Sequence, residues 1–150
     1  MANEAILIKG TKLNIAVTGV TALVADAGFA ECADDDRQPG NDAGYPLGLF
    51  EFNAVGTFSV APTAGAVINL YEQKINSSAS DAPDVSATYK NDYIGTFIVD
   101  AADVAQALSL VAPIHRDGGK YWIEWVDGGA GVASIAAGWT LDLTPVTYGT

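Results

Sequence analysis

The feature that most constrains the fold is a period-two alternation of apolar or small residues with polar residues at positions 50–60, broken only by Val55. Successive side chains of a β-strand point to opposite faces, so this pattern predicts a strand with one buried face. The segment 62–65, Pro-Thr-Ala-Gly, combines a fixed φ with a permissive glycine, which favours a chain reversal. Alternation resumes at 67–72, and the whole stretch predicts a strand, a turn and a second strand.

The same alternation recurs along the chain, most clearly where Trp139, Leu141 and Leu143 alternate with threonine and aspartate. Turn-forming glycines, lysines and threonines separate the shorter runs. An all-β domain of about eight strands is therefore expected. Besides the two strands above, the predicted strands are 5–8, 13–17, 21–24, 93–99, 121–126 and 139–146.

Residues 100–111 show signals for two structures. Asp100 is a good helix cap and the apolar residues that follow share a helical face, whereas alternation around Ser109 is typical of a strand at 107–111. We expect one helical turn followed by a strand, because the β-rich context favours it.

Two segments, 26–46 and 76–91, lack periodicity and are expected to be long loops, which in compact domains usually carry contacts. The glycine-rich segment 128–138 superficially resembles a phosphate-binding loop, but Ser134 stands where the third glycine is needed. We expect it to be a flexible tip between two strands.

Composition bounds the function classes. The 150 residues fit one domain, 1–150, and the net charge of −11 weighs against nucleic-acid binding, which requires lysines and arginines to displace counterions. With Cys32 as the single cysteine, no intrachain disulfide can form, so we expect synthesis in a reducing cytosol. Neither a signal peptide nor an apolar run long enough to cross a membrane is recognised, so no membrane partner is expected.

Candidate reactive groups are few. The acidic run 34–36 could indicate a calcium loop, but EF-hand spacing fails and a solvated acidic loop is the favoured interpretation. His115, the only histidine, precedes a turn without a nucleophile motif, and Cys32 beside acidic residues is expected to be a small buried apolar residue. We therefore predict no enzyme, and no catalytic residue, metal or cofactor.

Aromatic residues leave a binding function open. In 121–126 the side chains of Tyr121, Ile123 and Trp125 share one side of a strand, and Trp122 points to the other with Glu124. An exposed Trp122 could stack on a sugar ring or anchor a protein interface. The sequence does not choose between these two uses.

The order of these segments resembles a family of small virion proteins of tailed bacteriophages. Its members carry a strand ending in an A-P-T-A-G turn, a V-D-L-Y strand, a G-S-F strand and a closing strand of the type N-T-L-K-L-R-P-Y. The matching segments, over roughly the last two thirds of the chain, are 61–65, 68–71, 95–97 and 139–148. Asp142 and Thr144 replace basic residues of the family's closing strand, so contacts made through those positions do not transfer.

The resemblance implies a jelly-roll-like antiparallel β-sandwich that decorates the outside of a phage capsid as a cement protein. It implies a homotrimer bound to the major capsid protein on the virion surface, after synthesis in the host cytoplasm. Residues 1–48 have no quoted counterpart, and we expect an N-terminal arm or extra strands packed on, or swapped between, subunits. The expected interface residues are Ile6, Ile8, Leu13 and Trp122.

A carbohydrate-binding or host-attachment module of a tail, collar or head fibre is the alternative, with Trp122 and Tyr93 as the stacking residues. An enzyme is the weakest hypothesis, because one histidine and no nucleophile motif leave little for catalysis.

Overall fold

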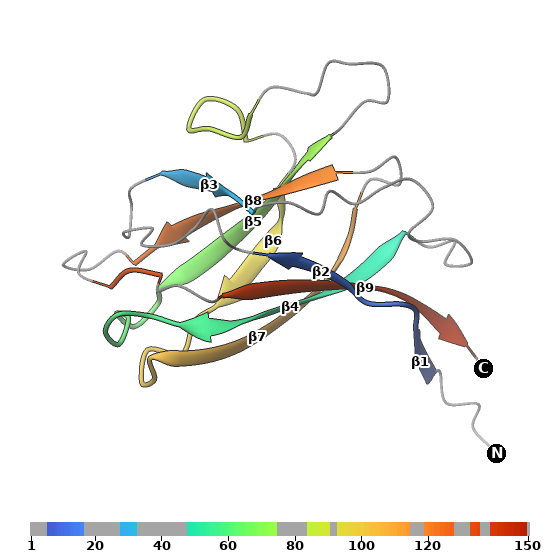
Figure 1. Cartoon of the computed structure of the whole chain (residues 1–150), viewed down its shortest axis with the longest axis horizontal. Coiled ribbons are helices and arrows are strands. Elements are labelled where there is room, and N and C mark those ends of the chain that lie inside the picture. The colour runs from blue at the N-terminus through green and yellow to red at the C-terminus, as the bar shows by residue number, and fades with distance from the viewer. Residues whose placement is uncertain are drawn as a thin grey trace.

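Two layers of antiparallel strands make up the structure, a computed structural model (Figure 1). It describes residues 6–16, 28–32, 48–74, 84–90, 93–114, 119–127, 133–135 and 139–149. The strands in these ranges are β1 (Ile6–Lys9), β2 (Leu13–Ala16), β3 (Phe29–Glu31), β4 (Leu49–Thr57), β5 (Val67–Lys74), β6 (Tyr93–Ile98), β7 (Ala105–Pro113), β8 (Gly119–Val126) and β9 (Thr140–Gly149).

The strand order identifies the sandwich as a jelly roll. One sheet runs β1-β9-β4-β7, with β2 also paired to β9, and the other runs β3-β8-β5-β6. Taking β2 as the first strand, these are the two four-stranded sheets that a pair of Greek keys produces. The predicted fold class, an all-β jelly-roll-like antiparallel sandwich, is confirmed, with nine strands in the described ranges where about eight were expected.

The alternation seen in the sequence fills the space between the sheets. Phe52 of β4 meets Tyr121 of β8 edge to face at 5.8 Å between ring centroids, and Phe58 stacks on Trp125 at 4.5 Å. Because close packing occupies the inner faces, only the outer faces of the two sheets remain to contact other molecules. The largest core side chains are Phe50, Phe52, Phe58, Ile68, Leu70, Phe97, Tyr121, Ile123, Trp125, Ile135, Trp139, Leu141 and Leu143.

The prediction of a helical turn after Asp100 is wrong. Gln106 is buried, and its Nε2 donates to the carbonyls of Asp100 (2.9 Å) and Asp103 (2.6 Å). The Asp100 carboxylate accepts from the Ala102 N–H at 2.8 Å. These side chains form hydrogen bonds with backbone groups of the turn that a helix would bond within itself. The helix does not form, and β7 begins directly after the turn.

Two of the expected loops also contain packed residues. The stretch 26–46 includes β3, whose three residues are too few to show alternation, and the Cys32 N–H continues its pairing to the Tyr121 carbonyl at 2.7 Å. Within 128–138, Ala133 and Ile135 are buried and the Ala133 carbonyl accepts from the Trp125 indole at 3.0 Å. At 133–135 the expected flexible tip is therefore part of the core. The strand predicted at 21–24 lies outside the described residues.

The N-terminal third contributes strands to both sheets. β1 and β2 pair with β9, and β3 pairs with β8. In Figure 1, β1 and the carboxyl end of β9 run out together beyond the two layers. No helix able to cross a membrane occurs in the described part of the chain.

Candidate binding surfaces

The projecting pair of strands, β1 with Val146–Gly149 of β9, is called the terminal ribbon below. Ile6 pairs with Gly149 and Ile8 with Thr147. Its apolar side chains are unusually open: Leu7 is 36% exposed, Ile8 46% and Tyr148 59%. Leu7 and Tyr148 are paired in register and share one face of the ribbon, whereas Ile8, the next residue along β1, belongs to the other face. The ribbon therefore presents apolar groups on both of its sides.

Two ion pairs fix the base of the ribbon and the strand beside it. Lys9 Nζ lies 2.5 Å from Glu51 Oε2, and Lys12 Nζ lies 2.9 Å from Asp142 Oδ2. Both lysines are half exposed, whereas the two carboxylates are largely covered. Lys9 is at the end of β1 and Lys12 lies between β1 and β2, so each ion pair joins the N-terminal segment to the body of the sheet. The two pairs help to orient the ribbon and neutralise the carboxylates of that face.

The four residues expected at an interface lie in three places. Ile6 and Ile8 are on the terminal ribbon, where the Ile8 side chain lies over Gly149 of β9. Leu13 is half-buried and packs against the core. Trp122 is on the opposite sheet, half-buried, and its indole N–H donates to Gln73 Oε1 at 2.8 Å. The structure thus brings together only the first two.

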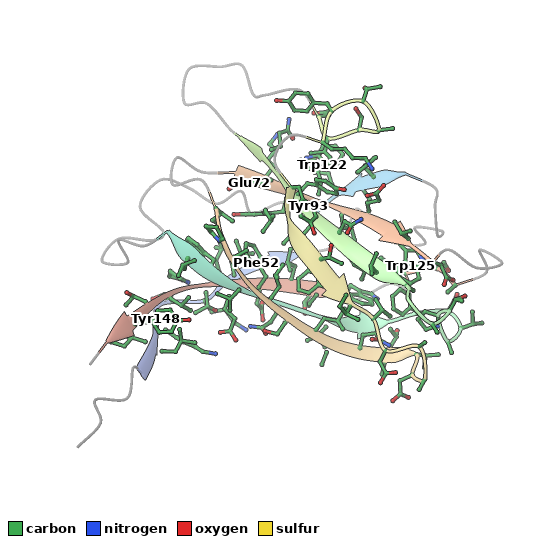
Figure 2. All side chains as sticks on the ribbon, turned by 180° about the vertical axis from the view of Figure 1, so that it is seen from behind. Phe52, Glu72, Tyr93, Trp122, Trp125 and Tyr148 are labelled. Carbon is green, nitrogen blue, oxygen red and sulfur yellow. The ribbon has the colours of Figure 1, made fainter. Side chains whose placement is uncertain are left out.

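A second surface covers the outer face of the β3-β8-β5-β6 sheet, on the side away from the ribbon (Figure 2). Glu124 is its centre: the carboxylate accepts from Tyr71 Oη at 2.8 Å, Lys90 Nζ at 2.9 Å and Asn69 Nδ2 at 3.1 Å. The network extends to Thr96, whose hydroxyl donates to Asn69 Oδ1 at 2.7 Å. The polar groups of this surface thus bond one another in a continuous network.

These contacts shift two pKa values. Burial alone would raise the pKa of Glu124, but hydrogen bonds from Lys90, Tyr71 and Asn69 outweigh it, and the pKa lies below its usual range. Burial and the neighbouring Glu124 carboxylate raise the pKa of Tyr71. At neutral pH the site therefore holds a carboxylate and a protonated phenol, joined by a charge-assisted hydrogen bond.

Aromatic rings border this network. Tyr71 meets Phe29 and Tyr93 edge to face, each at 5.6 Å between centroids, and Lys90 Nζ lies 4.9 Å from the Phe29 ring centre. Tyr93 is 53% exposed, so it offers an open ring beside polar groups. Figure 2 shows Tyr93 and Trp122 well separated from Tyr148 on the ribbon.

This network could not be predicted from the sequence. Asn69, Tyr71 and Glu124 appear there only as the polar positions of two alternating strands. The register that places Asn69 opposite Glu124 is a long-range pairing, and no local pattern contains it.

Cys32 is the buried apolar residue that was expected. Burial, with a smaller contribution from Glu31, raises the pKa of its thiol to about 12, so it stays protonated. Among the described residues, no three His, Cys, Asp or Glu side chains are grouped as a metal site requires. His115 and the acidic run 34–36 lie outside those residues.

Comparisons with protein-family models, curated proteins and solved structures gave no match. The fold and surfaces therefore define a structural class only: a jelly-roll sandwich with an apolar terminal ribbon at one end and a polar, aromatic face on one sheet.

Proposed function

We propose that the protein is a non-enzymatic virion protein that binds the outer surface of a phage capsid and stabilises the head, as a decoration or cement protein. Two points support this proposal: the resemblance of segments 61–65, 68–71, 95–97 and 139–148 to such proteins, and a jelly-roll sandwich of the kind that the resemblance implies. The observation that carries it is the terminal ribbon, where Leu7, Ile8 and Tyr148 hold apolar groups in solvent. The major capsid protein is the proposed partner.

The energetics of the ribbon favour a multivalent arrangement. Completing the burial of three half-exposed apolar side chains contributes a few kcal/mol, at roughly 1.5–3 kcal/mol for each fully buried side chain. Association itself costs about 4–15 kcal/mol in lost translational and rotational freedom, so we expect one ribbon alone to bind weakly. A homotrimer, which the resemblance implies, would present three ribbons and raise the effective concentration of the second and third contacts.

Ribbon variants test the proposal on parent phage heads that lack the protein. Ile8→Ser and Tyr148→Ser are expected to lower co-sedimentation with the heads by at least about tenfold, since each removes roughly 1.4 kcal/mol or more of contact. Val60→Ser is the matched control, because Val60 is similarly exposed but lies outside the ribbon. Heads carrying the wild-type protein should release DNA at higher temperature than bare heads.

Two results count against the proposal. One is wild-type protein that fails to sediment with the heads. The other is a set of ribbon variants that bind and protect as well as Val60→Ser, which would place the contact elsewhere.

A second candidate is a carbohydrate-binding module, favoured by one observation. The open ring of Tyr93 lies in contact with Tyr71, and its hydroxyl donates to Thr96 Oγ1 at 2.6 Å, because the Thr96 proton is already donated to Asn69. A stacking face beside polar groups is the combination that suits a sugar ring. A glycan array should then give a signal that Tyr93→Ala abolishes. Trp122→Ala is less informative, because the indole N–H is already bonded to Gln73. A silent array would remove this candidate.

A further inference from the structure

Strand β7 has no charged residue and is mostly apolar on both of its faces. Its inward residues include Leu108 and Leu110, half-buried against the core, and Leu110 fits over Gly95 of β6. Its outward residues are all exposed, yet none is charged: they are Ala105, Ala107, Ser109, Val111 and Pro113. A strand with one solvated face normally carries polar residues there, and a strand apolar on both faces is typical of one covered on both sides.

The outward side of β7, together with Val55 of β4, is called the β7 strip. Val55 is half exposed and lies opposite Ala107 in the register of the two strands. By contrast, the outward positions of β8 include Lys120 and Glu124, the usual solvent-facing pattern. The small side chains of the strip would let another sheet approach to the spacing of about 10 Å seen between packed sheets.

β7 is also an unprotected sheet edge. Within the described residues it pairs only with β4, along nine consecutive positions without a register shift. Natural edge strands are usually short, bulged or guarded by lysine or proline, which prevents pairing with another chain. β7 has no lysine, and its proline stands at the last position. Among the described residues, neither the face nor the edge of β7 therefore has a partner that its composition fits.

Charge identifies the partner. The chain carries a net charge of −11, so two copies repel unless they meet where carboxylates are absent or neutralised. The β7 strip has no charged residue, and on the same sheet face Glu51 and Asp142 are each paired with a lysine. This face can therefore meet an identical face without uncompensated negative charge.

We propose that the β7 strip binds the same strip of a second copy of this chain. An antiparallel arrangement fits best, because it holds Asp100 and Asp103, just before β7, about 30 Å from their counterparts, beyond the screening length of about 8 Å. The strip alone covers about 150 Å², and together with the outward faces of β4 and β9 beside it the contact covers about 400 Å² per copy. This is half of a standard interface, so the pairing is weak and depends on concentration. It joins copies two by two, adds to any trimer, and does not depend on capsid binding.

The test is sedimentation equilibrium over a wide protein concentration range. The wild-type species should double in mass as concentration rises. Ala107→Lys and Val111→Lys should each weaken this doubling at least tenfold, because lysine at these exposed positions places a charge in the contact without disturbing the core. Ile98→Lys is the matched control: Ile98 is 73% exposed and lies on the other sheet. It should associate as the wild type does.

A mixing experiment separates loss of contact from loss of fold. Ala107→Lys and Ala107→Glu should each associate poorly alone, and an equimolar mixture should recover the doubling, since opposite charges then meet across the strip. A misfolded variant would not recover. A wild type of constant mass, an Ile98→Lys variant weakened as much as Ala107→Lys, or a mixture without recovery would each overturn the proposal.

Discussion

Gly56 of β4 is the position where one added carbon should do most damage. A Cβ at Gly56 would lie 2.2 Å from Cγ of Trp139 and 2.3 Å from Cδ2. The indole cannot move freely: it is buried, meets Phe58 edge to face at 5.1 Å, and its N–H donates to the Thr57 carbonyl at 2.6 Å. Gly56 is thus required by close packing against a ring that three contacts hold in place.

The magnitude follows from the distances. Carbon atoms pack best at about 3.5–4.0 Å, so the ring would have to retreat by more than 1 Å. Overpacking of this kind costs about 1–3 kcal/mol, and complete loss of a buried tryptophan about 3–5 kcal/mol. Alanine recovers roughly 0.5–1 kcal/mol of backbone entropy relative to glycine. We expect Gly56→Ala to lower the free energy of unfolding by about 3 kcal/mol.

Urea unfolding measures this loss directly. The midpoint should fall at unchanged m-value, with Tm lower by about 10 °C for a chain of this size. Thr57→Ala, at the adjacent exposed position, is the control and should stay within about 0.5 kcal/mol of wild type. In a Trp139→Ala background, Gly56→Ala should lose its cost, since the ring is gone. A Gly56→Ala protein as stable as wild type, or an equal cost in both backgrounds, would refute the steric explanation.

Three further outcomes are expected. Because the folded pKa of Glu124 is depressed, its stabilisation is present above the unfolded value of about 4.3 and is lost as pH falls through the lower folded value. Glu124→Gln should therefore be less stable than wild type at pH 7 but equal to it in strong acid, and a pH-independent difference in urea unfolding would contradict this. The Cys32 thiol, with its pKa raised to about 12, should resist a disulfide reagent at pH 8 until urea unfolds the chain, whereas rapid labelling of the native protein would contradict its burial. Gly65 has φ of 89°, so Gly65→Ala should cost about 1–2 kcal/mol in the same unfolding assay, and a stabilised variant would show that this turn conformation is not required.

Of the nine described strands, sequence reasoning located all except β3, including the short β1 and β2. β4, β5, β8 and β9 each repeat the inward pattern often enough to be recognised locally. β3 was missed because three residues cannot display a period, and its pairing depends on β8, more than 90 residues away. At 100–103 a helix-capping residue is present, but the Gln106 side chain bonds the backbone carbonyls of the turn, and no helix forms there.

The binding surfaces were less predictable than the strands. Ile8 was expected at an interface and is exposed, but Thr147 and Tyr148 are brought beside it and Leu7 only by pairing of the two ends of the chain. Likewise Lys90 and Glu124 are 34 residues apart and Tyr71 and Glu124 are 53 apart. Alternation tells which side of a strand a residue takes, whereas register decides what lies beside it.

The distribution of charge is compatible with the proposed binding function. Each lysine with a described ion pair neutralises a carboxylate on a sheet or its base; the pairs are Lys9–Glu51, Lys12–Asp142, Lys90–Glu124 and Lys120–Glu31. The negative excess therefore lies largely between the longer strands, as in 26–46, where six carboxylates accompany one arginine. Acidic connections keep free copies soluble, and neutral sheets remain able to make apolar contacts at short range. A protein that works by contact needs both properties, and neither requires a reactive group.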